Sequence, residues 1–154
     1  MNLSDFIDLS SIRLDVAAKD KRALLQQMGQ LAGLKLGIEP ARVVDALIER
    51  ERLGSTGFGG GIAIPHGKIA GLDKVHGLVL RLDQPVDYKA IDKMPVDLLF
   101  CLLSPIDRGA EHLRALAAVS RAVRDGATVE RLRGARDRDA FNAVLMSCDE
   151  RTAA

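Results

Sequence analysis

The chain has 154 residues, nearly half of them apolar, which suits one domain of about 100–200 residues with a substantial core. Its 22 basic and 21 acidic residues are interleaved and leave a net charge of +1, which argues against the basic patch of a nucleic-acid-binding protein. No apolar run reaches the ~18 residues of a membrane span, and the first residues lack the basic cluster of a signal peptide, so we expect a cytoplasmic protein.

Two helices are predicted in the first third of the chain. In residues 18–36, apolar side chains recur every three to four positions from Leu24 to Leu31, which is typical of an amphipathic helix. Gly37 is a suitable C-terminal cap for this helix. The second helix is expected over residues 40–53, because its leading proline fits the first turn of a helix.

Strands are predicted in the middle of the chain. A glycine-rich loop, residues 54–61, precedes a short extended segment, residues 62–64. Residues 75–82 follow an alternating pattern that puts Leu78, Leu80 and Leu82 on one face, whereas residues 96–103 are apolar except at Asp97, as in a strand covered on both faces. Residues 85–89 are a candidate for one more short strand.

The C-terminal part is predicted to be helical, over residues 109–125 and, in two shorter helices, 129–132 and 139–146. The first of these helices is expected to turn inward Leu113, Leu116, Val119, Ala122 and Val123. Residues 151–154 are expected to form a short frayed tail. Helices that alternate with strands and cluster around them predict a single α/β domain over residues 1–154, with a mixed β-sheet flanked by helices on both faces.

The segment from Gly54 to Lys68 is rich in glycine but matches neither common nucleotide-binding motif. A P-loop needs a glycine five residues before its Gly-Lys pair and Ser or Thr after it, whereas Ile62 and Ile69 occupy these positions. The dinucleotide fingerprint needs a third glycine where Ile62 again stands. We therefore expect no nucleotide and no other cofactor, and the glycines indicate backbone freedom.

The same segment fixes one histidine, His66, between Pro65 and Gly67. The proline restricts φ on one side, and the glycine permits a close approach on the other. A neutral imidazole with a pKa near ~6.5 is a competent nucleophile at cellular pH, and its attack on a phosphoryl donor would make a phosphohistidine. Residue type alone leaves either ring nitrogen as the reacting atom.

Three segments carry a resemblance to a known family. Residues 61–67, Gly-Ile-Ala-Ile-Pro-His-Gly, resemble the phosphorylation motif of mannitol/fructose-type IIA proteins of the bacterial phosphotransferase system. Residues 50–57, Arg-Glu-Arg-Leu-Gly-Ser-Thr-Gly, resemble the nitrogen-regulatory (IIA-Ntr) branch. Residues 111–113, Glu-His-Leu, with Leu116 resemble the helix of the family's second histidine, and the match extends along the whole chain.

The resemblance implies a role for each candidate site residue. His66 would accept a phosphoryl group from an HPr-like phosphocarrier protein, His112 would support it, and Arg50 would neutralise phosphoryl charge. The hydroxyls of Ser55 and Thr56 are candidate phosphoryl contacts, although a helix-to-loop turn explains these two residues equally well.

Other residues receive structural predictions. His76 shares a strand face with leucines and is expected to be structural; three histidines without ligand spacing do not predict a metal site. Cys101 lies in an apolar run, and with Cys148 it makes neither a disulfide framework nor a metal-ligand spacing. Phe58 and the glycine loop are candidates for an apolar docking patch near the phosphorylated histidine.

Three functions follow from these observations. The first is a regulatory phosphotransferase component whose phosphorylation state switches its binding to target proteins. The second is a sugar-specific IIA component that passes the phosphoryl group to a IIB domain during fructose or mannitol uptake. The separate chain and its Gly-Ser-Thr-Gly segment favour the first over the second. The third is a regulatory binding module that works without phosphorylation.

Overall fold

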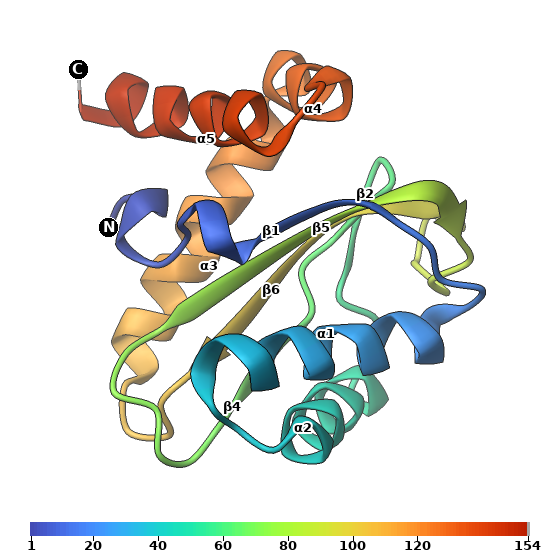
Figure 1. Cartoon of the computed structure of the whole chain (residues 1–154), viewed down its shortest axis with the longest axis vertical. Coiled ribbons are helices and arrows are strands. Elements are labelled where there is room, and N and C mark those ends of the chain that lie inside the picture. Colours follow the sequence, from blue (N-terminus) through green and yellow to red (C-terminus); the bar gives the residue numbers. More distant parts are fainter. Residues whose placement is uncertain (154) are drawn as a thin grey trace.

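The computed structural model describes residues 1–153 and, up to Arg151, their side chains; it contains an open mixed sheet with helices on both faces (Figure 1). The strands are β1 (Ile12–Val16), β2 (Gly57–Gly59), β3 (Ile62–Ala63), β4 (His66–Lys68), β5 (His76–Val86) and β6 (Val96–Ser104). The α-helices are α1 (Lys21–Leu36), α2 (Pro40–Arg52), α3 (Gly109–Arg124), α4 (Gly126–Gly134) and α5 (Arg138–Ala153). Two 3-10 turns, η1 (Leu3–Asp5) and η2 (Leu9–Ser11), precede β1.

The sheet has the strand order β1-β5-β6-β3-β2, and β4 also pairs with β6. Strands β5 and β6 form a long antiparallel pair, whereas β3 and β4 both run parallel to β6, one after the other along it. Between them the Pro65 carbonyl accepts a hydrogen bond from the Leu102 N–H at 2.9 Å. As a result His66 pairs with Leu102, near the end of β6, which places the imidazole at one end of the sheet.

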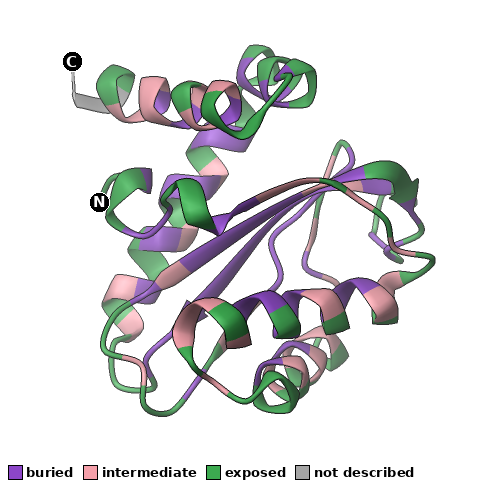
Figure 2. Cartoon of the chain, in the orientation of Figure 1, coloured by how far each residue is buried: buried purple, intermediate pink, exposed green. Residues whose placement is uncertain are grey.

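Two apolar cores cover the two faces of the sheet. Helices α1 and α2 lie on one face, and α3 with α4 and α5 lies on the other (Figure 1). Strand β6 alternates between the cores, sending Leu98, Phe100 and Leu102 to the α3 side and Leu99, Cys101 and Leu103 to the α1 side. This explains why β6 is apolar apart from Asp97 and the final Ser104. The strand is buried at every position except Asp97 (Figure 2), and the predicted α/β fold class is confirmed.

The ends of the first two helices follow from their capping residues. Helix α1 begins at Lys21, three residues later than predicted, because the Asp20 carboxylate accepts a hydrogen bond from the Ala23 N–H at 2.8 Å and caps the helix. It ends at Leu36, and the following Gly37 caps it in a left-handed conformation with φ of 69°. Pro40 occupies the first turn of α2, as predicted.

Two predictions in the second half are wrong. Leu113 was expected to face inward from α3, but it is 66% exposed. The buried stripe of this helix runs through positions such as Ala115 and Val119 and does not include Leu113. Residues 85–89 do not form a separate strand: Pro85 and Val86 complete β5 after an irregularity in its register with β6.

The C-terminal helices are longer than predicted. Helix α5 continues through Ala153, whereas a frayed tail was predicted from Arg151 onward. Arg151 donates hydrogen bonds to the Asp125 carboxylate at 3.2 Å and the Thr128 hydroxyl at 2.7 Å, and so ties α5 to α4. Ala154 lies outside the described residues. Within residues 1–153, no helix combines the length and apolar content needed to cross a bilayer.

Candidate functional site

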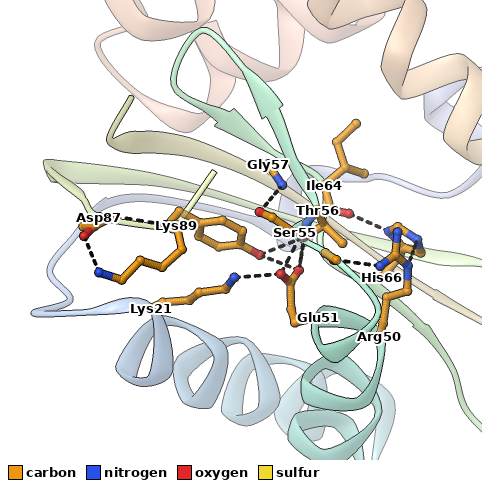
Figure 3. A network of polar contacts seen from close by, with 12 residues as sticks. Lys21, Arg50, Glu51, Ser55, Thr56, Gly57, Ile64, His66, Asp87 and Lys89 are labelled. Carbon is orange, nitrogen blue, oxygen red and sulfur yellow. Dashed lines mark hydrogen bonds and ion pairs between the residues drawn. The ribbon is translucent and has the colours of Figure 1, made fainter. Parts of the chain in front are cut away.

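His66 lies half-buried on β4 with its ring orientation set by the backbone (Figure 3). Its Nδ1 is 2.6 Å from the Ile64 carbonyl oxygen. Because a carbonyl oxygen only accepts hydrogen bonds, Nδ1 carries the proton and Nε2 keeps a lone pair. Gly67 allows β4 to lie close to α2, since a Cβ atom there would stand 3.2 Å from the Ala46 Cβ.

Arg50 approaches His66 from the last turn of α2 (Figure 3). Its Nε donates to His66 Nε2 at 3.1 Å, and its Nη1 donates to the Gly54 carbonyl at 2.9 Å. A cation is favourable at this end of a helix because of the helix dipole. Arg52, two residues further along α2, instead pairs with Glu49 at 3.0 Å, and both of these side chains are more than 70% exposed.

His112 lies in α3 beside His66, with the two ring centroids 5.4 Å apart and the ring planes tilted by 51°. It is only 8% exposed. Its Nδ1 is 2.5 Å from the hydroxyl of Ser104, the last residue of β6. The fold therefore brings together His66, His112 and Arg50, which are distant in sequence, at one end of the sheet.

Both imidazoles are neutral near pH 7. Burial lowers the pKa of His66, and the Arg50 guanidinium lowers it further, against the opposing effect of the hydrogen bond to the Ile64 carbonyl. Burial also lowers the pKa of His112 to about 4, with further contributions from His66 and Lys68. A lone pair on a neutral ring, held beside an arginine that donates to it, is the chemistry required of a nucleophile for an anionic group.

A carboxylate next to Arg50 holds the loop that follows α2 (Figure 3). Glu51 accepts hydrogen bonds from Lys21 Nζ at 2.7 Å, the Tyr88 hydroxyl at 3.2 Å, and both the N–H and the hydroxyl of Thr56. Lys21 also lies 4.3 Å from the centroid of the Tyr88 ring. Burial raises the pKa of Tyr88 well above its ordinary range, so its hydroxyl remains a donor.

The two predicted hydroxyl contacts differ in their surroundings. Thr56 is buried, and its hydroxyl is engaged by Glu51 and Tyr88, which argues for the turn interpretation of this residue. Ser55 is half-buried, and its oxygen accepts a hydrogen bond from the Gly57 N–H at 3.0 Å. The Ser55 hydroxyl proton has no acceptor among the described residues, so it stays a candidate donor to an anion.

The remaining predicted residues lie apart from this arrangement. His76, at the start of β5, is 3.4 Å from the Asp73 carboxylate. Phe58 is 37% exposed on the edge strand β2. Residues 1–153 contain no cluster of three or more His, Cys, Asp or Glu side chains that could hold a metal ion. Sequence reasoning missed Glu51 and Ser104; the only signal for Ser104 is a polar residue ending an apolar strand.

The mixed sheet and the paired histidines define an α/β domain whose site can accept a small anionic group on an imidazole. The chain belongs to the family described as "Phosphoenolpyruvate-dependent sugar phosphotransferase system, EIIA 2", which matches residues 5–148. It is 40% identical over 145 residues to a nitrogen regulatory protein of Bradyrhizobium diazoefficiens, covering 94% of this chain and 95% of that protein.

Solved structures agree with this family. Nitrogen regulatory protein IIA-Ntr from Neisseria meningitidis superimposes with a TM-score of 0.88 at 34% identity, covering 93% of this chain and 98% of the other. The fold is also that of the Escherichia coli enzyme IIAMtl, solved in complex with phosphorylated enzyme IIBMtl, with a TM-score of 0.77 at 22% identity, covering 92% and 97%. The resemblance inferred from the three sequence segments is thereby confirmed.

Proposed function

We propose that this protein is a regulatory phosphoryl carrier in which Nε2 of His66 accepts a phosphoryl group from a histidine of an HPr-like phosphocarrier. The observation that carries this proposal is the 2.6 Å contact of His66 Nδ1 with the Ile64 carbonyl. It holds the proton on Nδ1 and leaves the lone pair on Nε2, the nitrogen that faces Arg50. Because this donor belongs to a cytoplasmic pathway, we place the exchange in the cytoplasm.

The transfer forms one P–N bond and breaks another. The Nε2 lone pair of His66 attacks phosphorus, and the donor imidazole leaves with the electron pair of its own P–N bond. The His66 ring gains positive charge as the bond forms, and the Ile64 carbonyl oxygen, held against Nδ1–H, stabilises that charge. In a loose transition state, negative charge is spread over the equatorial phosphoryl oxygens and is stabilised by hydrogen-bond donors. Catalysis therefore depends mainly on how the two histidines and these donors are positioned.

Arg50 has a different partner before and after transfer. In this structure its Nε–H is bonded to the lone pair that must attack, so it has to release Nε2 as the phosphoryl group arrives. The guanidinium can then donate to phosphoryl oxygens while Nη1 remains on the Gly54 carbonyl. His112, 5.4 Å away between ring centroids, is close enough to donate to the same group.

The test is phosphorylation by phosphoenolpyruvate, the first enzyme of the pathway and an HPr-like carrier, followed by intact mass. We expect one acid-labile phosphoryl group on the wild type and none on His66→Ala. His76→Ala is the matched control, because it removes a histidine outside the site, and should be phosphorylated fully. Arg50→Ala should be phosphorylated more slowly with its fold intact. A wild type that stays unmodified in a working donor chain would move the assignment to a binding module.

The acceptor decides between two roles. The 40% identical relative bears the name nitrogen regulatory protein, which favours regulatory target proteins. The shared fold with IIAMtl, which was solved with its IIB partner, supports the sugar route as the second candidate. Incubating the phosphorylated protein with fructose- and mannitol-type IIB domains separates them. Loss of the phosphoryl group to a IIB domain would establish the sugar route, and retention would support the regulatory one.

A further inference from the structure

We propose that Ser104 is a positioning residue that holds His112 as the Nε2–H tautomer, so that its proton faces the group carried by His66. This inference rests on the proposed phosphoryl transfer. Ser104 ends β6 and is fully buried, and its Oγ lies 2.5 Å from His112 Nδ1. Its backbone is fixed as well, since its carbonyl accepts a hydrogen bond from the Ile69 N–H at 2.8 Å.

The direction of the hydrogen bond between Ser104 Oγ and His112 Nδ1 follows from which arrangement satisfies both groups. The contact with His112 is the only one made by the Ser104 hydroxyl among the described residues. If Nδ1–H donated to Oγ, the serine proton would be buried without an acceptor, which is unfavourable. If the hydroxyl donates to Nδ1, every buried atom of the pair is satisfied. The second arrangement puts the ring proton on Nε2.

The other ring nitrogen has no partner in residues 1–151. Asn142 Oδ1 is the only buried side-chain oxygen or nitrogen atom without a partner in this part of the chain, so His112 Nε2 is reached by solvent. With its proton on Nε2, a neutral His112 is a donor to an arriving anion. The other tautomer would present a lone pair to phosphoryl oxygens, which repels them.

The low pKa of His112, about 4, makes this tautomer matter. A protonated imidazole donates from both nitrogens and needs no tautomer control. A neutral one has a single N–H, and its position decides between attraction and repulsion. A buried hydroxyl at the end of β6 therefore contributes to the site without touching the phosphoryl group.

The experiment compares Ser104→Thr with Ser104→Val, which have nearly the same shape and differ by the hydroxyl. Two quantities are measured on each: the ¹⁵N spectrum of the His112 ring, and the rate of phosphorylation by the HPr-like carrier. We expect Nε2–H alone in the wild type and the Thr variant, and a mixture of tautomers in the Val variant. The Val variant should transfer roughly three- to tenfold more slowly than the Thr variant, the effect of one hydrogen bond.

Either of two results would overturn the inference: an Nδ1–H tautomer in the wild type, or equal rates and equal spectra for the Thr and Val variants. If the added methyl group unfolds both variants, Ser104→Ala serves as the hydroxyl-free protein and is compared with the wild type in the same two measurements. If the wild type accepts no phosphoryl group, the proposed function fails, while the ring spectrum still decides the tautomer independently.

Discussion

Replacing Glu51 by glutamine should destabilise the protein more than any other single removal of charge on α2. The carboxylate is 8% exposed and lies 2.7 Å from Lys21 Nζ, with further donors from Thr56 and Tyr88. Glutamine keeps the shape but removes the charge and points an amide N–H at groups that are themselves donors. Breaking a buried ion pair in this way lowers the free energy of unfolding by about 3–5 kcal/mol. Because the Lys21 side chain is 21% exposed and solvent screens its charge, we expect a decrease of about 3 kcal/mol.

The assay is urea unfolding followed by circular dichroism, with thermal unfolding beside it. For a domain of this size, about 3 kcal/mol corresponds to a fall in Tm of roughly 6–12 °C. Glu49→Gln is the matched control on the same helix: its side chain and that of Arg52 are more than 70% exposed, so the change should be within about 0.5 kcal/mol. A Glu51→Gln protein as stable as Glu49→Gln would refute the reasoning that this network holds the loop.

The other predictions concern titration and packing. The chemical shifts of the His112 ring protons should follow a titration with a midpoint near pH 4. Because the pKa of His112 is lower in the folded than in the unfolded protein, the unfolded state binds more protons below pH ~6.5, and the free energy of unfolding should fall as the pH is lowered from about 6.5 toward 4. Gly29→Ala should destabilise by about 1–3 kcal/mol in urea unfolding, because its Cβ would lie 2.5 Å from Val44 Cγ2. Gly126→Ala, which meets nothing within 4 Å, should be neutral or stabilising. Tyr88→Phe should cost about 1 kcal/mol in the same assay through loss of its buried hydroxyl.

The elements that the sequence predicts well are those with a local physical signal. Gly37 and Pro40 mark helix ends because their backbone preferences act at a single position. The apolar run of β6 is visible because both of its faces are covered. Leu113 shows the converse: helical spacing admits it to the apolar stripe, but its exposure depends on where the sheet lies.

The site divides in the same way. His66 can be singled out as a site residue because the motif that identifies it consists of its immediate neighbours in sequence. Arg50 and His112 can be assigned to the site only through the family resemblance. Glu51 and Ser104 are not, because their roles exist only once distant segments meet. Ser104 acts on a helix eight residues further along the chain, and Glu51 joins its own loop to partners on α1 and beyond β5. No spacing rule in the sequence encodes such contacts.

The geometry also bears on how a regulatory partner could read the phosphorylation state. Before transfer the site holds the Arg50 cation beside two neutral rings; under the proposed function, a phosphoryl group would bring about −1.5 to −2 charge to the same place. Three apolar residues that lie near the site residues in sequence, Leu53, Ile106 and Leu113, are 60% or more exposed. Their apolar character is the same in both phosphorylation states. Apolar contacts would then contribute to the binding of any partner, whether it recognises the phosphorylated or the unphosphorylated protein. The sign of the charge at the site would select which partner binds. Because His66, His112 and the loop are each held by fixed hydrogen bonds, this reversal of charge can change the surface without a change of fold.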